Sequence, residues 1–381
     1  MKRSRSLAAL GLIVPLLAAC GSSPGGSSAG PEARIPVTVN DAGCSPSSIE
    51  AAAGRIVFEV TNAGSDVGEF EVLSGTRVVD EVENIVPGFV INFATRLDGG
   101  SYDLICYSLQ SPRGTLAVSG GAAPSRPPSA VVDADTLSGY QAAYSEYVRA
   151  EAAALVTAIE PFVARIEAGD LEAAKTAYAP SRPHWERIEP VAELFSDLDT
   201  RMDAREEDFA LGVEDPEFLG WHRLEKGLWA DGTTEGLAPI AVGLRNDVAE
   251  LKQRLDELDI EPRVMARGAG ELIEEVAQSK LTGEEDRYSE ADLWSIEANV
   301  AGSKKIVDIL RPTLETVDAA WLERADAAFA DVDEVIAKYR DGDGFKSFSE
   351  ISEVDLKALQ ARMAGLSEVL AALPGILGLE A

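Results

Sequence analysis

Two residues of the chain, His222 and Glu225, have the types and the spacing of a metal-binding pair. On a helix, positions i and i+3 project from one face about one turn apart, so this imidazole and this carboxylate could bind one cation. His-x-x-Glu also occurs on many helices that bind no metal, so the motif alone is weak evidence. We expect both side chains to face solvent, and the rest of the chain must support the site.

Acidic residues that could complete a metal site follow the same pattern elsewhere. Glu186 and Glu189 repeat the i, i+3 spacing, Asp203 lies in an acidic stretch, and Glu285 lies in a run of three acids. Singly, such residues usually belong to solvated faces or to the first turns of helices. Together with one imidazole they form an oxygen-rich ligand set, which suits iron better than a thiolate-type zinc site. The sequence has no His-Glu-x-x-His motif, which excludes the zincin type of metalloprotease.

The chain is strongly acidic. Its 381 residues include 65 Asp and Glu against 34 Lys and Arg, which gives a formal net charge of -31. A surface of this charge repels nucleic acid and concentrates cations. We therefore exclude a nucleic-acid partner. The acidity supports a cation ligand without proving one, because it also serves solubility.

The N-terminus has the pattern of an export signal. Basic residues precede an apolar run that ends in Leu-Ala-Ala, which predicts a signal peptide over residues 1–19. Cys20 follows as in a bacterial lipobox, so we expect it to be lipidated, with residues 20–33 as a flexible tether. No later segment reaches the roughly 18 to 20 apolar residues that a membrane span needs. We expect an exported protein that is lipid-anchored to the cell membrane on its periplasmic or extracytoplasmic face.

Residues 34–119 have the pattern of a small β domain. Short runs rich in β-branched and aromatic residues alternate with turn sequences. The expected strands cover 35–39, 55–62, 69–73, 89–94, 101–106 and 114–118. We predict an antiparallel β-sandwich or barrel. A linker rich in Pro, Ser and Gly follows over residues 120–132.

This β domain resembles a cupredoxin, because Cys106 lies in its penultimate expected strand, where that fold usually carries its copper thiolate. A blue-copper centre also needs two His and usually an axial Met. His184 and His222 both lie in the other half of the chain, and no Met occurs between Met1 and Met202. A type 1 copper site is therefore excluded.

Two roles remain open for Cys44 and Cys106, which are 62 residues apart. In an exported protein a disulfide is the default, and closing that loop would stabilise the domain by roughly 4 kcal/mol. The alternative is a reduced pair that binds a second metal together with Glu69 or Glu71, since alternation along a strand puts both acids on one face.

Residues 133–381 read as helices with no strand signal. The expected helices cover 140–166, 171–198, 216–229, 240–258, 263–279, 290–316, 319–339 and 354–373. Pro180 and Pro183 break the second of these, and Ser289 with Asp292 is a predicted capping pair. We predict an α-helical bundle.

The whole mature chain resembles the EfeO family of periplasmic iron-uptake proteins, which joins a cupredoxin-like domain to an imelysin-like (M75 peptidase-type) helical domain. The resemblance rests on the order of the two domains and on the motif at 220–226, which contains His222 and Glu225. Further matching stretches are 83–89, 185–198, 283–289 and 292–294.

The resemblance implies a protein that binds iron, as Fe²⁺ or Fe³⁺, and passes it to a membrane iron permease, with a haem peroxidase as a further partner. It implies one metal-binding group formed by His222 and Glu225, and a second formed by Glu186, Glu189, Asp203 and Glu285. The lipobox departs from family members that are free in the periplasm, and it alters tethering only.

Two classes of function stay open. The first is a non-enzymatic iron-binding lipoprotein, which we expect. The second is an M75-type metallopeptidase that uses His222 as a ligand and Glu225 as a ligand or base. The sequence offers no convincing nucleophile or second zinc ligand set for proteolysis.

Overall fold

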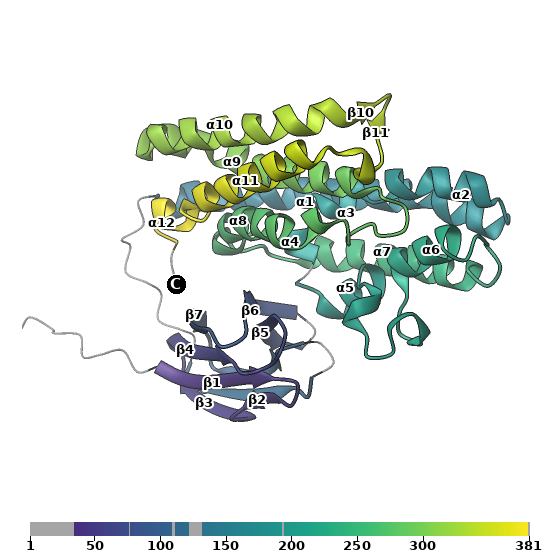
Figure 1. Cartoon of the computed structure of the whole chain (residues 1–381). Coiled ribbons are helices and arrows are strands. Elements are labelled where there is room, and N and C mark those ends of the chain that lie inside the picture. The colour runs from purple at the N-terminus through teal and green to yellow at the C-terminus, as the bar shows by residue number, and fades with distance from the viewer. Residues whose placement is uncertain (1–33, 76, 109–110, 122–131, 193, 380–381) are drawn as a thin grey trace, which may run out of the picture. The chain divides into compact units, whose positions relative to one another are not determined.

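The computed structural model describes residues 34–75, 77–108, 111–121, 132–192 and 194–379. The predicted signal peptide, the tether with Cys20 and most of the linker 120–132 lie outside these residues. Strands fill the N-terminal part and helices the C-terminal part, so the predicted order of a β domain and then a helical domain is confirmed (Figure 1). Among the described residues, no helix combines the length and apolar character that a membrane crossing requires.

The β domain is a sandwich of two sheets, with strand orders β2-β1-β4-β7 and β3-β9-β8-β5-β6. Its strands are β1 (Arg34–Asn40), β2 (Gly43–Ser45), β3 (Ser48–Ala52), β4 (Gly54–Asn62), β5 (Gly68–Ser74), β6 (Arg77–Ile85), β7 (Val90–Leu97), β8 (Gly100–Cys106) and β9 (Gly114–Ser119). The prediction of a purely antiparallel sandwich is wrong, because β1 pairs with β4 and β3 pairs with β9 in parallel.

Three strands were not predicted, each for a physical reason. β2 has three residues and is too short to show alternation. β3 contains Glu50 and three alanines or serines, which are weak strand formers. β6 carries Asp80 and Glu81 and lies at the edge of its sheet, where charged residues are common.

The two sheets share one apolar core. Phe58 of β4 and Phe70 of β5 come from opposite sheets, and their ring centroids lie 5.1 Å apart. A disulfide between Cys44 of β2 and Cys106 of β8 also joins the sheets. Because a bonded sulfur offers no thiolate, the structure does not form the alternative metal site from Cys44, Cys106 and Glu69. The main chain of Glu69 instead pairs with that of Tyr107.

The helical domain is a bundle of long helices with a stretch of short ones in the middle. The helices are α1 (Ala134–Glu167), α2 (Leu171–Tyr178), α3 (Pro183–Glu186), α4 (Glu189–Ala192), α5 (Ser196–Met202), α6 (Gly220–Trp229), α7 (Ala238–Glu257), α8 (Pro262–Gln278), α9 (Asp292–Val317), α10 (Ala319–Ile336), α11 (Glu353–Leu370) and α12 (Leu373–Leu377). The long helices α10 and α11 pack side by side, as do α1 with α7 and α8 with α9 (Figure 1).

The short helices α3 to α5 arise where the sequence interrupts a helical pattern with prolines. Pro183 is the first residue of α3, and Pro190 is the second residue of α4. Backbone N–H groups in the first turn of a helix have no partner within that helix, so a proline there costs no hydrogen bond. These breaks turn the chain repeatedly within a few residues. Polar side chains from α3, α4 and the end of α5 therefore reach the interior of the bundle.

Three expectations for this domain need correction. A two-stranded hairpin, β10 (Arg340–Asp341) with β11 (Gly344–Phe345), lies between the expected helices 319–339 and 354–373, in a region for which no strand was predicted. α6 begins at Gly220 instead of residue 216. The capping pair of Ser289 with Asp292 does not form, because α9 begins at Asp292 and the Asp292 carboxylate accepts the backbone N–H of Asp286.

Candidate metal centre

The start of α6 brings His222 next to the end of α5. Gly220 has a φ of +70°, which favours glycine, and its Cα lies against the main chain of Met202. Asp203 follows Met202 directly, so the turn into α6 places His222 beside that carboxylate. Nε2 of His222 lies 3.3 Å from Oδ1 of Asp203.

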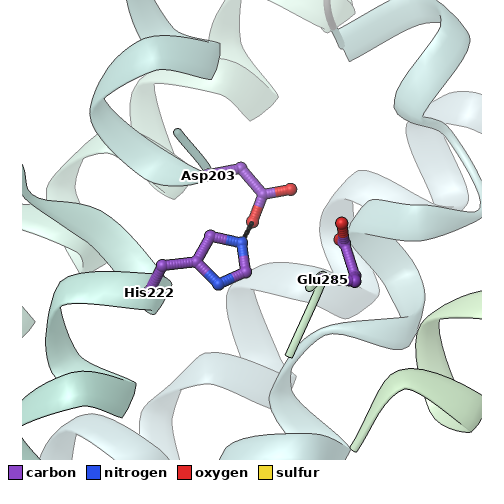
Figure 2. A group of neighbouring side chains, drawn as sticks. All are labelled: Asp203, His222 and Glu285. Atoms are coloured by element: carbon purple, nitrogen blue, oxygen red, sulfur yellow. Dashed lines mark ion pairs between the residues drawn. The ribbon is translucent and has the colours of Figure 1, made fainter. Parts of the chain in front are cut away.

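His222 lies between two carboxylates in the interior of the domain. Its Nδ1 is 3.5 Å from Oε2 of Glu225, one turn further along α6. Figure 2 shows the Asp203 carboxylate facing the ring, with the Glu285 carboxylate nearby from a different element. Only 3% of His222 and 1% of Glu225 are exposed. The expectation that these two side chains face solvent is therefore wrong.

Possible ligand atoms gather around this imidazole in two overlapping groups. Asp203, His222 and Glu285 form one group, and His222, Glu225 and Asp286 form the other, with all ligand atoms of a group within 4.8 Å of one another. His222 belongs to both. The arrangement therefore supplies one imidazole and four carboxylates, each from a side chain that is buried or nearly so.

Glu225 is held by the backbone of a distant segment. Its Oε1 accepts N–H bonds from Tyr288 at 3.0 Å and from Ser289 at 2.7 Å. Its Oε2 is buried and has no partner among the described residues other than Nδ1 of His222 at 3.5 Å. One oxygen thus fixes the carboxylate, while the other faces only the imidazole at a long distance and could accept a bound cation.

Arg182 and Trp185 orient the Asp203 carboxylate, and Arg182 donates to the same Oδ1 that faces His222. The carboxylate accepts hydrogen bonds from Arg182 at 2.5 Å and from the indole N–H of Trp185 at 2.7 Å. Burial would raise the pKa of Asp203, but Arg182 and His222 together hold that pKa well below its ordinary value. Asp203 is therefore ionised at neutral pH and available as an anionic ligand.

Glu285 and Asp286 are neighbours with different partners. Glu285 pairs with Arg182 and with Arg205, each at 3.1 Å. Asp286 accepts hydrogen bonds from the hydroxyl of Tyr178 at 2.7 Å and from the hydroxyl of Ser295 at 3.0 Å. These bonds fix both carboxylates before any metal arrives, which lowers the ordering cost of binding one.

Protonation of His222 follows from its neighbours. Burial would lower the pKa of this imidazole, but hydrogen bonds to Asp203 and Glu225 raise it to about 10. Burial raises the pKa of Asp286 to about 7. Without a metal, the imidazole carries a proton that is shared between two carboxylates, and a metal ion would have to replace that proton.

The four acids assigned to a second metal group are divided by the structure. Asp203 and Glu285 lie in the His222 cluster, whereas Glu186 and Glu189 lie around the ammonium group of Lys280. The two groups adjoin, because Lys280 is also 3.6 Å from Glu285 and Arg182 also pairs with Glu186. Nζ of Lys280 is 2.5 Å from Glu189 and 3.3 Å from Glu186.

Lys280 supplies a fixed positive charge at that place. It is 1% exposed, and although burial would lower its pKa, Glu186 and Glu189 raise it well above the ordinary value. The amide of Asn299 also donates to both carboxylates. The chain's own ammonium group thus stands where a metal would have to bind between Glu186 and Glu189.

Sequence reasoning missed Asp286, Arg182 and Lys280. The sequence did contain an indication that Asp286 belongs to the site, because Asp286 adjoins Glu285 in the run of three acids. For Arg182 and Lys280 it contained none, since Arg182 lies between Pro180 and Pro183, which break the helical pattern, and Lys280 follows the end of the expected helix 263–279. Both are nevertheless 1% exposed.

Comparison with known proteins agrees with this fold. The imelysin family model (Peptidase_M75) matches residues 140–373, and the cupredoxin-like domain model matches residues 9–118. A crystal structure from Parabacteroides distasonis, described as an iron-regulated protein A precursor, aligns with a TM-score of 0.50 at 15% identity, covering 66% of this chain and 97% of that one. The protein thus belongs to the class in which a cupredoxin-like domain is followed by an imelysin domain.

Relatives with the same domain order define the family more narrowly. The iron uptake system component EfeO of Escherichia coli K12 is 46% identical over 347 residues, which cover 91% of this chain and 92% of that protein. EfeO of Shigella flexneri matches equally well. The chain belongs to the EfeO family.

Proposed function

We propose that this protein is an extracytoplasmic, non-enzymatic component of an iron-uptake system that captures iron and passes it to a membrane iron permease. The observation that carries the proposal is the buried His222 flanked by the carboxylates of Asp203, Glu225, Glu285 and Asp286. The relatives' role as iron uptake system components supports the same conclusion.

The ligand chemistry of this cluster favours iron. Carboxylate oxygens with a single imidazole suit Fe²⁺ and Fe³⁺, whereas tightly held structural zinc usually has thiolate or several imidazole ligands. Arg182 and Arg205 neutralise part of the carboxylate charge in the metal-free protein. Because these arginines compete with the metal for the same oxygens, they moderate its affinity, which a protein that must give up its cargo requires.

Delivery depends on a partner in the membrane. The predicted lipid anchor at Cys20 and the tether 20–33 would hold the protein beside a permease in the same membrane, which raises the effective concentration of the two. A haem peroxidase in the same system would act on the iron supply. The anchor affects where iron is delivered and leaves the binding chemistry unchanged.

The peptidase alternative has less support. The cavity that reaches His222 and Glu225 has about 10 Å³ of free space, about the minimum for one water molecule. A peptide bond with its flanking residues needs an open cleft. The buried and internally paired carboxylates are better suited to holding an ion than to receiving a polypeptide.

The test is a metal titration with a matched control. Wild-type protein and the double variant His222→Gln/Glu225→Gln are titrated with Fe²⁺ under anaerobic conditions and with Fe³⁺-citrate, by calorimetry and by metal analysis. The control is His184→Gln/Glu151→Gln, which removes the chain's other His–Glu pair, whose atoms lie 2.6 Å apart. We expect the first variant to lose iron and the control to bind as wild type does.

Casein is incubated with the same proteins and iron. Binding without cleavage supports the proposal. Cleavage that depends on Glu225 would support the peptidase instead, and equal iron binding by all three proteins would show that the His222 cluster is not the site.

A further inference from the structure

The His222 cluster is closed from solvent by a second layer of charged residues. His222, Glu225 and Glu285 line the inner part of the cavity, and Arg205 and Arg287 line its outer part. Its free space of about 10 Å³ is too small for an iron ion with its water shell. Iron can therefore reach or leave the inner ligands only if the outer layer opens.

Three carboxylates meet one guanidinium in this outer layer. Arg287 donates to Oε1 of Glu206 at 2.6 Å and to Oε2 of Glu284 at 2.6 Å, and its Nη2 is 3.1 Å from Oε2 of Glu207. The hydroxyl of Tyr288 donates to the second oxygen of Glu206. We call Glu206, Glu207, Glu284 and Arg287 the outer cluster.

The outer cluster joins two segments that are far apart in the sequence. Glu206 and Glu207 belong to the short helix η2 (Glu206–Asp208), and Glu284 and Arg287 precede α9. With side chains between 21% and 52% exposed, these residues contact solvent on one side. The cluster thus spans the boundary between bulk water and the buried ligands.

The segment that carries Arg287 also holds the inner ligands. Residues 284–289 contribute Glu285 to the inner wall, and the N–H groups of Tyr288 and Ser289 fix Glu225. This segment lies between two left-handed positions, Gly283 at φ +80° and Glu290 at φ +56°. Such positions mark sharp changes of chain direction, about which a segment can move as a unit.

A second observation indicates that the cavity receives a cation. Glu225 lines this cavity, and its buried Oε2 has no partner among the described residues other than Nδ1 of His222, which lies 3.5 Å away. A buried carboxylate oxygen with a single partner at this long distance is poorly satisfied, which is costly, and an incoming cation would remove that cost. The outer carboxylates and this inner oxygen therefore lie along one route by which a cation could pass from solvent to His222.

We propose that Arg287 closes a cation gate. Its guanidinium holds the carboxylates of Glu206, Glu207 and Glu284 together, and an arriving iron ion displaces the guanidinium from these carboxylates before it moves inward. This inference rests on the proposed function and adds to it the route of the ion. Release follows the same steps in reverse. The outer carboxylates are transient ligands, so Arg287 governs how fast iron moves and affects little how tightly it is held.

The test separates rates from affinity. Wild type and Arg287→Gln are mixed with Fe²⁺ anaerobically in a stopped-flow instrument, and association is followed by quenching of tryptophan fluorescence, since Trp185 contacts Asp203. Dissociation is followed by transfer of Fe²⁺ to ferrozine. We expect Arg287→Gln to raise both rate constants about tenfold, the size expected when a barrier loses two or three partly exposed ion pairs, with Kd changed less than about threefold.

Two further variants act as controls. Arg287→Lys keeps the charge and should restore much of the slow exchange. Arg245→Gln removes an arginine of matching exposure, 32% against 33% for Arg287, that also pairs with two glutamates but lies on α7. Arg245→Gln should exchange iron at wild-type rates.

The outcomes distinguish this inference from the proposed function. Rate constants of Arg287→Gln within twofold of wild type overturn the gate while iron binding by wild type stands. A change in dissociation alone, with matching loss of affinity, also overturns it, because Arg287 would then only support the ligands. Wild-type protein that binds no iron overturns both.

Discussion

The Cα of Gly220 lies so close to Met202 that an added Cβ atom would be 2.0 Å from the Met202 carbonyl oxygen. Through this contact, the first turn of α6 packs directly against the last turn of α5. It therefore sets the distance between His222, two residues after Gly220, and Asp203, the residue after Met202.

Gly220→Ala should disturb the site through the backbone. The φ of +70° is unfavourable for alanine, and the clash is with main chain that cannot rotate away. We expect a loss of at least about 2 kcal/mol of unfolding free energy and weaker iron binding, measured by urea unfolding and calorimetry. Gly243→Ala on α7 is the control: its Cβ meets nothing within 4 Å, so it should be neutral or stabilising. Equal behaviour of the two variants would contradict this role of Gly220.

The sequence could predict those parts of the site that depend on helix geometry alone. His222 and Glu225 lie on one face of α6 because i, i+3 spacing is a local property. The meeting of Asp203 with His222 depends on the turn between α5 and α6. The family resemblance instead grouped Asp203 with Glu186, Glu189 and Glu285.

The fold shows the same division between local and long-range information. Strand and helix order followed from periodicity, and Pro180 and Pro183 marked the break after α2. The parallel pairing of β1 with β4 could not be predicted, since it depends on how the intervening strands cross between sheets. The burial of Lys280 could not be predicted either, because it follows from the acidic residues packed around it.

Lys280→Met tests the internal ion pairs. Methionine nearly fills the volume of lysine but leaves Glu189 buried without a cation, while Glu186 keeps only its ion pair with Arg182, so we expect a loss of about 3–5 kcal/mol in urea unfolding. Lys252→Met, which removes an exposed i, i+4 pair with Asp256, should cost less than about 0.5 kcal/mol. Adding Glu189→Gln to Lys280→Met should recover part of the loss. A Lys280→Met protein as stable as wild type would show that the Glu189 carboxylate needs no cation.

Reduction of the Cys44–Cys106 disulfide should destabilise the β domain. The bond closes a loop of 62 residues, for which the chain-entropy model gives a stabilisation of roughly 4 kcal/mol. We expect calorimetry with a phosphine reductant to show a lower unfolding temperature for the β domain. Iron binding by the helical domain should persist as long as that domain stays folded. An unfolding profile that is identical with and without reductant, after confirmed reduction, would contradict the prediction.

The pH dependence of stability can be tested at a pair outside the metal centre. Burial would raise the pKa of Glu151, but hydrogen bonds and charge from His184 and Arg187 lower it below the ordinary value of 4.5. A lowered pKa in the folded state means that the carboxylate contributes stability above pH 4.5 and loses that contribution as the pH falls through the folded-state pKa. Glu151→Gln should therefore be less stable than wild type at pH 7, and the difference should shrink below about pH 4. Glu172→Gln, whose side chain is 84% exposed, serves as the control and should match wild type throughout. Urea unfolding between pH 3.5 and pH 7 measures both differences, and a Glu151→Gln deficit that stays constant over this range would mean that the carboxylate acts by packing instead of charge.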